Sequence, residues 1–354
     1  MSCLDSWQQR EAMLELATDT KRRVFVLGAG FSLSAGFPLV RVLRDEAIGV
    51  LRKSPWQVLL EPGNGGYTDG QFNAALSAIE RSRRLLPFEE LLIALQHEVD
   101  SASSVSGLCS LATDTLKDSC LRLFWTRQNA ISELPECYTN FRGWVNNWWS
   151  SGPAHAVITF NWDLVVEKAL VGWWAYSLDG TRNTPVLKPH GSINWSTHLE
   201  EKLKAGYDGW KPIGQESQFC YDAQNPLTNP DKDFIHSPFL KYMVFPGNPN
   251  QTGERLSVKL IWDDVERVLS GADVVVFIGY SLPDYDSQAG EVFRRHAFGK
   301  EIEVFNPSAG DLTKYSVVFG GKAALNCQAF ESCPYARRPA SWRHCADVEE
   351  NGAS

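Results

Sequence analysis

Short apolar runs that each end in a small or polar residue are the feature that most restricts how this chain can fold. Such runs occupy residues 24–27, 156–160, 272–278 and 303–305, and they are rich in valine, isoleucine and phenylalanine. Runs of this kind are typical of strands buried in a parallel sheet. Val40, Leu43 and Ala47, after the first run, have the spacing of an amphipathic helix. The pattern predicts the α/β class, with a doubly wound, Rossmann-like parallel sheet whose ligand lies at the carboxyl ends of the strands.

The chain of 354 residues is long for one compact domain, so an insertion is expected. Between the first two strand runs, residues 88–99 and 108–125 carry apolar side chains at steps of three and four, which is typical of helices. We predict one α/β domain over residues 1–354, with a helical subdomain inserted at residues 50–145. Residues 311–354 are expected to form a C-terminal extension.

Charge and cysteine usage narrow the class of protein. The net charge is −8 and the sequence contains no block of lysine or arginine, which argues against direct nucleic-acid binding. No apolar run approaches the roughly 18 residues that span a bilayer, so a membrane role is not expected. The eight cysteines are scattered, and no signal segment opens the chain. We therefore expect a cytoplasmic protein with reduced thiols.

The first strand run leads into a glycine turn. Such a turn lets the backbone come close to a pyrophosphate, while the next helix presents N–H groups and its positive dipole end. The third glycine of a redox dinucleotide fingerprint would stand at position 33, where this chain has Leu33. The sequence thus departs from the redox pattern. The candidate ligand-binding residues of the turn are Gly28, Ala29, Gly30, Phe31, Ser32, Gly36 and Pro38.

Further polar residues follow the later strand runs. Asn161 and Asp163 come after the second run, and His190 stands in a loop after a further predicted strand. Gly279 and Ser281 follow the most apolar run of the chain. Because the carboxyl ends of parallel strands share one edge of a sheet, these residues are predicted to gather around one ligand.

Taken in order, these motifs resemble those of the sirtuin superfamily: GAGxSxxxGxP, TxNxD, HG and a GxS loop. The resemblance covers roughly residues 20–310, tightly only at the strand ends. It implies an NAD site across the sheet, with nicotinamide near Asn161 and His190. It also implies that Asn306, after the fourth strand run, approaches the adenosine side.

The chain departs from the protein deacetylases of that superfamily. Those enzymes carry two CxxC pairs that bind a structural zinc ion, whereas this sequence contains no CxxC pair. We therefore expect no metal. The zinc-free pattern with a large helical segment resembles the sirtuin-like NAD hydrolases of bacterial antiphage defence. That resemblance implies NAD as a substrate and abortive infection by NAD depletion.

The residue types suit cleavage of the bond between nicotinamide and ribose. The reaction passes through an oxocarbenium-like state, so it needs groups that orient water and accept its proton. Asn161 is predicted to orient the water, and His190 to accept the proton directly or through a ribose hydroxyl. Asp163 has two interpretations: it supports the ribose or the nicotinamide amide from behind, or it is a helix N-cap.

Two other functions remain open at this point. The same site could transfer ADP-ribose or remove an acyl group from a protein, or the chain could be a silent subunit that senses NAD or ADP-ribose. An NAD hydrolase needs control, so we predict a homo-oligomer or a separately encoded partner. In the related defence systems such partners include a translocase-type ATPase or a short Argonaute. The sequence does not choose among these partners.

Overall fold

The computed structural model describes residues 21–53, 77, 86, 88–100, 106–146, 155–176, 178, 183–195, 210–213, 220–224, 226–227, 256–319 and 323–337. A seven-stranded sheet forms the centre, in the order β3-β4-β2-β1-β7-β8-β9. Every described pairing within it is parallel. Its strands are β1 (Arg23–Leu27), β2 (Ala156–Thr159), β3 (Trp174–Ala175), β4 (Thr184–Leu187), β7 (Val274–Ile278), β8 (Glu301–Phe305) and β9 (Ala323–Asn326).

The strand order confirms the predicted doubly wound fold. From the central β1, the chain builds β2, β3 and β4 on one side and then returns to add β7, β8 and β9 on the other. Strands β1 and β7 are the most apolar runs, and the side chains of β7 are all buried. The order in which strands are added therefore reverses at β1. The carboxyl ends of β1, β2 and β7 open onto the crevice where such folds bind ligands.

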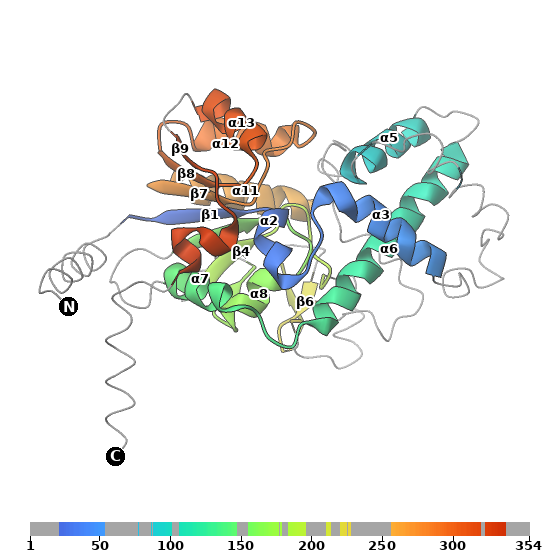
Figure 1. The fold of residues 1–354 in the computed structure, drawn as a ribbon, viewed down its shortest axis with the longest axis horizontal. Coiled ribbons are helices and arrows are strands. Elements are labelled where there is room, and N and C mark those ends of the chain that lie inside the picture. Colours follow the sequence, from blue (N-terminus) through green and yellow to red (C-terminus); the bar gives the residue numbers. More distant parts are fainter. Residues whose placement is uncertain are drawn as a thin grey trace, which may run out of the picture.

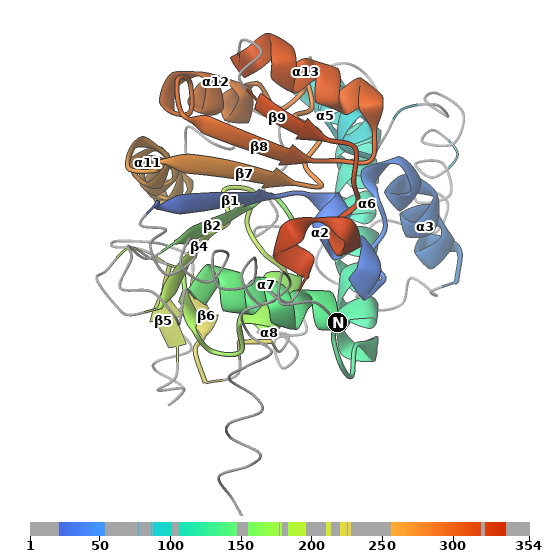
Figure 2. The ribbon, with the colours of Figure 1, turned by 60° about the vertical axis from the view of Figure 1, so that its left-hand side comes forward.

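Helices cover the sheet on both sides (Figures 1 and 2). In both views the strands are stacked from β9 at the top to β4 at the bottom; α12 and α13 lie near the β9 end, and α7 and α8, which pack together, lie near the β4 end. The bounds of the core helices are α2 (Ala29–Ser32), α7 (Glu136–Asn146), α8 (Val165–Leu170), α11 (Leu256–Ser270), α12 (Ser287–His296) and α13 (Ala309–Phe319). A separate hairpin pairs β5 (Trp210–Pro212) with β6 (Cys220–Asp222).

A second group of helices lies beside the carboxyl ends of the strands (Figures 1 and 2). It contains α3 (Val40–Lys53), α5 (Phe88–Asp100) and α6 (Ser106–Ala130), which pack against one another. Helix α7 lies within the expected insertion at residues 50–145 but packs against α8 of the core. We therefore propose that α3, α5 and α6 form the helical subdomain; most of residues 54–87 lie outside the described part.

The expected C-terminal extension at residues 311–354 begins too early. Strand β9 pairs in parallel with β8 as the last strand of the sheet, so residues 323–326 belong to the core fold. Phe330 and Tyr335 beyond it are buried among aromatic side chains of the core. The short edge strand Ala-Ala-Leu-Asn lacks the β-branched run that marked the other strands. Residues 338–354 lie outside the described residues.

Candidate functional site

A cavity of about 1420 Å³ opens at the carboxyl ends of the central strands. Four of its lining residues directly follow strands: Gly28 after β1, Asn161 close behind β2, Gly279 after β7 and Asn306 after β8. Residues of α3, α5 and α6 line the opposite wall. The structure thus brings the predicted strand-end residues together in one space. Of the predicted set, those that line it are Gly28, Ala29, Gly30, Ser32, Pro38, Asn161, Asp163, His190, Gly279, Ser281 and Asn306.

The glycine turn packs directly against the end of β7. A Cβ atom on Gly28 would lie 2.6 Å from Cα of Tyr280, and one on Gly30 would lie 2.7 Å from Cα of Gly279. The backbone N–H of Gly28 donates to Ile278 O at 3.1 Å, and that of Gly30 donates to Gly279 O at 3.0 Å. These two N–H groups are therefore used within the protein, and the glycines serve close backbone packing rather than direct phosphate contact.

Two residues of the predicted turn do not line the cavity. Phe31 is fully buried, with its ring centroid 5.0 Å from that of Phe141, and its carbonyl accepts a hydrogen bond from Tyr138 Oη at 2.7 Å. Gly36 has a φ of 90° and ends a short 3₁₀ turn by donating its N–H to Leu33 O at 2.9 Å. Both residues shape the loop, Phe31 by anchoring it in the core and Gly36 by reversing it.

Asn161 is held by the glycine turn. Its Nδ2 donates to Gly28 O and to Ser32 Oγ, both at 2.9 Å. The amide nitrogen therefore faces the turn, and the Oδ1 atom is left as the end of the side chain that can accept a hydrogen bond from a ligand. The side chain is 92% buried by this packing, since only 8% of the residue is exposed.

Asp163 lies just before Leu164, which is the N-cap residue of α8. Its Oδ1 accepts a hydrogen bond from Val165 N at 3.0 Å at the start of α8, and the residue also lines the cavity. Burial raises the pKa of this carboxyl to about 6, although the nearby Lys188 ammonium acts in the opposite direction. The carboxylate is thus anchored by a helix start while it remains part of the cavity wall.

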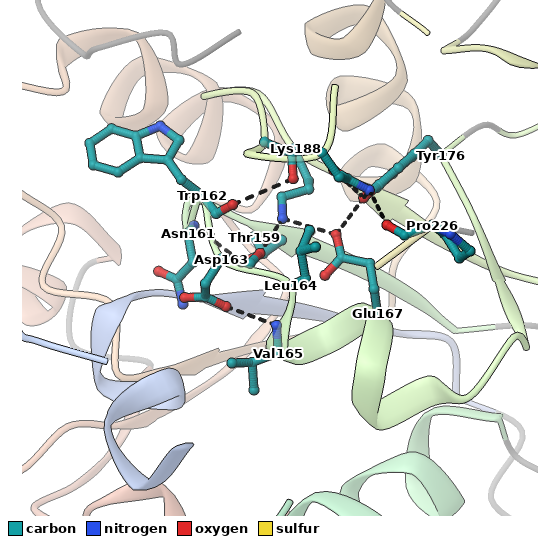
Figure 3. Close-up of polar contacts among 12 residues, drawn as sticks. Thr159, Asn161, Trp162, Asp163, Leu164, Val165, Glu167, Tyr176, Lys188 and Pro226 are labelled. Atoms are coloured by element: carbon teal, nitrogen blue, oxygen red, sulfur yellow. Dashed lines mark hydrogen bonds and ion pairs between the residues drawn. The ribbon is translucent and has the colours of Figure 1, made fainter. Parts of the chain in front are cut away.

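A buried ion pair supports the Asn161–Asp163 loop from behind (Figure 3). Lys188 Nζ donates to the backbone oxygen of Asp163 at 2.6 Å and to Glu167 Oε1 at 2.9 Å. Both charged side chains have no exposed surface. Tyr176 Oη donates to the same Glu167 oxygen at 2.6 Å. The loop that presents Asn161 is therefore fixed by charge-assisted hydrogen bonds in a water-poor environment.

His190 faces a carboxylate and an aromatic ring. Its Nε2 atom lies 3.2 Å from Asp286 Oδ2, and its side chain is 8% exposed. The ring of Phe160 meets the imidazole edge to face, with a centroid distance of 4.8 Å. Trp162 Nε1 donates to the His190 carbonyl at 2.8 Å. These contacts fix both the backbone and the ring of His190.

Asp286 is a site residue that sequence reasoning did not assign. Its Oδ1 atom accepts from Ala289 N at 3.3 Å as the N-cap of α12, and its Oδ2 atom accepts from Tyr280 Oη at 3.2 Å. The residue is 3% exposed and lines the cavity. Its position before a helix indicated only a cap. Its partnership with His190 depends on the meeting of two loops that are far apart in the sequence.

The loops after β7 and β8 are tied together. Asn306 Nδ2 donates to Tyr280 O at 3.1 Å, and Asn306 Oδ1 accepts from Ser308 N at 2.9 Å. Gly279 has a φ of 62°, and a Cβ atom there would lie 2.5 Å from the backbone of Gly30. Asn306 therefore holds the wall of the cavity in place, while Ser281 lies on its surface.

Glu89, from α5, is the second residue that sequence reasoning did not assign. It lines the cavity and is 6% exposed, and its Oε2 atom is buried without a hydrogen-bond partner among the described residues. Burial, assisted by the charge of Asp286, raises the pKa of its carboxyl to about 7. In the sequence the residue resembled an ordinary acidic first turn of a helix.

Within the described ranges no group of three or more histidine, cysteine, aspartate or glutamate side chains could hold a metal ion. The cysteines whose side chains the structure describes form no disulfide: Cys120, Cys137, Cys220, Cys327 and Cys333. No described helix is both long and apolar enough to cross a membrane.

No protein-family model and no curated protein matches the chain. Among solved structures it is similar to a Sir2 homologue in complex with NAD, at 15% identity and a TM-score of 0.44, covering 96% of this chain and 94% of that one. A mutant Sir2 homologue in complex with ADP-ribose has 15% identity and a TM-score of 0.40, covering 96% and 98%. At these values the likeness carries no inference about function.

Proposed function

We propose that this protein binds NAD as its substrate and hydrolyses the bond between nicotinamide and ribose without a metal. The observation that carries the proposal is the convergence of Asn161 and the His190–Asp286 pair in one cavity with the glycine turn. The sirtuin-like order of motifs supports NAD as the dinucleotide. The cavity is also large enough for a dinucleotide, since ligand pockets commonly occupy about 300–1,000 Å³.

The contacts assign each residue a part in the reaction. Asn161 Nδ2 is occupied by the glycine turn, so Oδ1 accepts a hydrogen bond from the attacking water and orients it. The water oxygen bonds to C1′ as the C1′–nitrogen bond breaks, and nicotinamide leaves with the bonding electron pair. His190 takes the proton of the water, and Asp286 stabilises the resulting imidazolium. The products are nicotinamide, ADP-ribose and a proton.

The test is chromatography of NAD incubated with the purified protein and with three variants. Nicotinamide and ADP-ribose are expected from the wild type, with strong losses for Asn161→Ala and His190→Ala. His296→Ala is the matched control. His296 is the last residue of α12, its Nε2 atom lies 3.3 Å from Glu266 Oε2 of α11, and it does not line the cavity. Intact NAD with the wild type, despite binding, would favour the sensing subunit instead.

A second candidate is transfer of ADP-ribose or deacylation of a protein acceptor. The cavity exceeds the common range of single-ligand pockets, and its far wall contains apolar residues of the helical subdomain, Leu43, Ile93 and Phe124. The space next to this wall can hold an acceptor beside the dinucleotide. Products bound to an added protein or acyl-lysine peptide, in place of free ADP-ribose, would identify this reaction.

We further propose a role in antiphage defence, through NAD depletion and abortive infection in the cytoplasm. This proposal rests on the motif resemblance alone, as does control by a homo-oligomer or by a translocase-type ATPase or short Argonaute. The expected result is a fall in cellular NAD on phage challenge of bacteria that express the wild type. Cells that express His190→Ala should keep their NAD.

A further inference from the structure

Glu89 differs from the other polar residues of the cavity because one oxygen of its carboxyl is buried without a hydrogen-bond partner among the described residues. It stands in the first turn of α5, on the wall opposite the strand ends. Its Oε2 atom is buried and has no hydrogen-bond partner among the described residues. A buried carboxylate oxygen without a partner costs free energy, and at the wall of a cavity the positive charge of a ligand can reduce that cost.

The lining of the cavity as a whole is acidic. Among the lining side chains, the arginine and lysine are Arg41 and Lys314, and Lys314 Nζ lies 3.4 Å from Asp284 Oδ2. Such a wall attracts a cation more readily than an anion. The carboxylate residues that line the cavity are Glu89, Glu90, Asp163, Asp284, Asp286 and Asp311.

Several titratable groups surround Glu89. Asp286 raises the pKa of Glu89, and Asp286 is itself next to His190. From α6, which packs against α5, the Cys120 thiol has its pKa raised by burial and by the charge of Glu89. The charged and titratable groups of the cavity wall and the packed helices are Arg41 of α3, Glu90 and His97 of α5, Lys117 and Cys120 of α6, and Asp163, His190, Tyr280, Asp284, Tyr285, Asp286, Asp311 and Lys314 of the sheet side.

We propose that Glu89 recognises the positive charge of the substrate's nicotinamide end and therefore selects oxidised over reduced dinucleotide. This inference rests on the proposed function, because it takes NAD as the ligand. The pyridinium ring of NAD is a cation, whereas the ring of NADH is neutral. As the bond to nicotinamide breaks, the positive charge moves to ribose C1′, so one carboxylate can stabilise both species.

The ionisation of Glu89 gives this selection a pH dependence. The ionised carboxylate attracts the cation, and the protonated form does not. Because the pKa of the free carboxyl is raised to about 7, its ionised fraction increases about tenfold between about pH 6 and about pH 8. The preference for the cationic ligand should increase over the same interval. Asp163, whose pKa burial raises to about 6, also lines the cavity, so the contribution of Glu89 is measured as the difference between the wild type and Glu89→Gln.

Calorimetric titration tests this inference without turnover. The probes are NADH and the carbocyclic analogue of NAD, which keeps the pyridinium but resists cleavage of the ring–sugar bond. For the wild type, the ratio of affinities should rise by up to about tenfold between about pH 6 and about pH 8. Glu89→Gln should give a lower ratio that does not change with pH. Glu291→Gln, which removes an exposed carboxylate of α12 that does not line the cavity, should behave as the wild type.

The outcomes separate this inference from the proposed function. A pH-dependent preference that survives in Glu89→Gln, with a normal melting profile, would overturn the role of Glu89 while NAD cleavage by the wild type stands. Wild type that binds neither dinucleotide would overturn the proposed function and this inference with it. Glu89→Asp, which keeps the charge, should restore most of the pH-dependent preference and so rule out a general packing effect of the glutamine.

Discussion

The two walls of the cavity hold their polar groups in different ways. At the strand ends, Asn161 and His190 contact partners in the protein, and a buried ion pair supports their loops. On the helical wall, Glu89 has a buried oxygen without a partner among the described residues. The strand-end wall is therefore built to keep its geometry with or without a ligand, whereas the helical wall has an electrostatic cost that a ligand can remove.

The largest expected effect is on turnover at the strand-end wall. His190→Ala should lower kcat by about a hundred- to ten-thousandfold, because it removes the proton acceptor. Asp286→Asn should cause a smaller loss, since asparagine can still cap α12 but cannot stabilise the imidazolium. Initial rates of nicotinamide release provide the measurement. Equal rates for His190→Ala and wild type would mean that this wall is not the reaction centre.

Breaking the Lys188–Glu167 ion pair, which supports the Asn161–Asp163 loop, should destabilise the protein. Lys188→Met leaves the fully buried Glu167 carboxylate without its cation and should lower the free energy of unfolding by about 3–5 kcal/mol. The double variant Lys188→Met/Glu167→Leu should lose less. Urea denaturation measures both.

The control for that prediction is an exposed pair. Lys21 Nζ lies 2.6 Å from Glu301 Oε2, and both side chains are 51% exposed. Lys21→Met should cost only about 0–1 kcal/mol because water screens the pair. A cost for Lys188→Met as small as this would show that the loop does not depend on the buried pair.

Removing the charge of Glu89 should stabilise the protein at high pH, whereas removing that of Lys188 destabilises it. Its pKa is raised from 4.5 to about 7 in the folded protein, so the folded state loses stability as the pH rises from the lower to the higher value. Glu89→Gln removes this loss and should raise the free energy of unfolding at about pH 8 by up to about 3 kcal/mol. Near pH 4, where both states are protonated, the two proteins should have similar stability. Urea denaturation at the two pH values measures the difference. If Glu89→Gln is less stable than the wild type at the higher pH, the Glu89 carboxylate is not buried without a partner.

A smaller effect is expected from the glycine turn. Gly28→Ala places a Cβ atom 2.6 Å from Cα of Tyr280, so the turn and the β7 loop must separate, at a cost of about 1–3 kcal/mol. Gly290, within α12, has nothing within 4 Å of such an atom. Gly290→Ala should therefore stabilise the protein by about 0.5–1 kcal/mol. Thermal unfolding compares the two; equal effects would mean that the close packing at Gly28 is not required.

The same division between the walls explains what could be predicted from the sequence. Runs such as Val274–Ile278 are buried on both faces, so local composition indicated the strands, and the shared edge of a parallel sheet placed Asn161 near Gly28. The pairing of His190 with Asp286 depends on tertiary structure, because an aspartate before a helix is adequately explained as a cap.

The sequence contains no comparable pattern for the residues of the helical wall or for the edge strand β9. Glu89 owes its burial to the docking of α5 beside the strand ends, which helical periodicity does not specify. Lys188 is fully buried although lysine is usually exposed, so its support of the loop could not be inferred from residue type. Strand β9 was missed because small residues at a sheet edge make no apolar run.

The most direct test of the central claim is incubation of NAD with the wild type in water enriched in the heavy isotope of oxygen, followed by mass spectrometry. Hydrolysis at the strand-end site predicts free nicotinamide together with ADP-ribose that carries one heavy oxygen at C1′, and far less of both products from His190→Ala. Intact NAD, or cleavage that continues unchanged in His190→Ala, would contradict hydrolysis at the strand-end site.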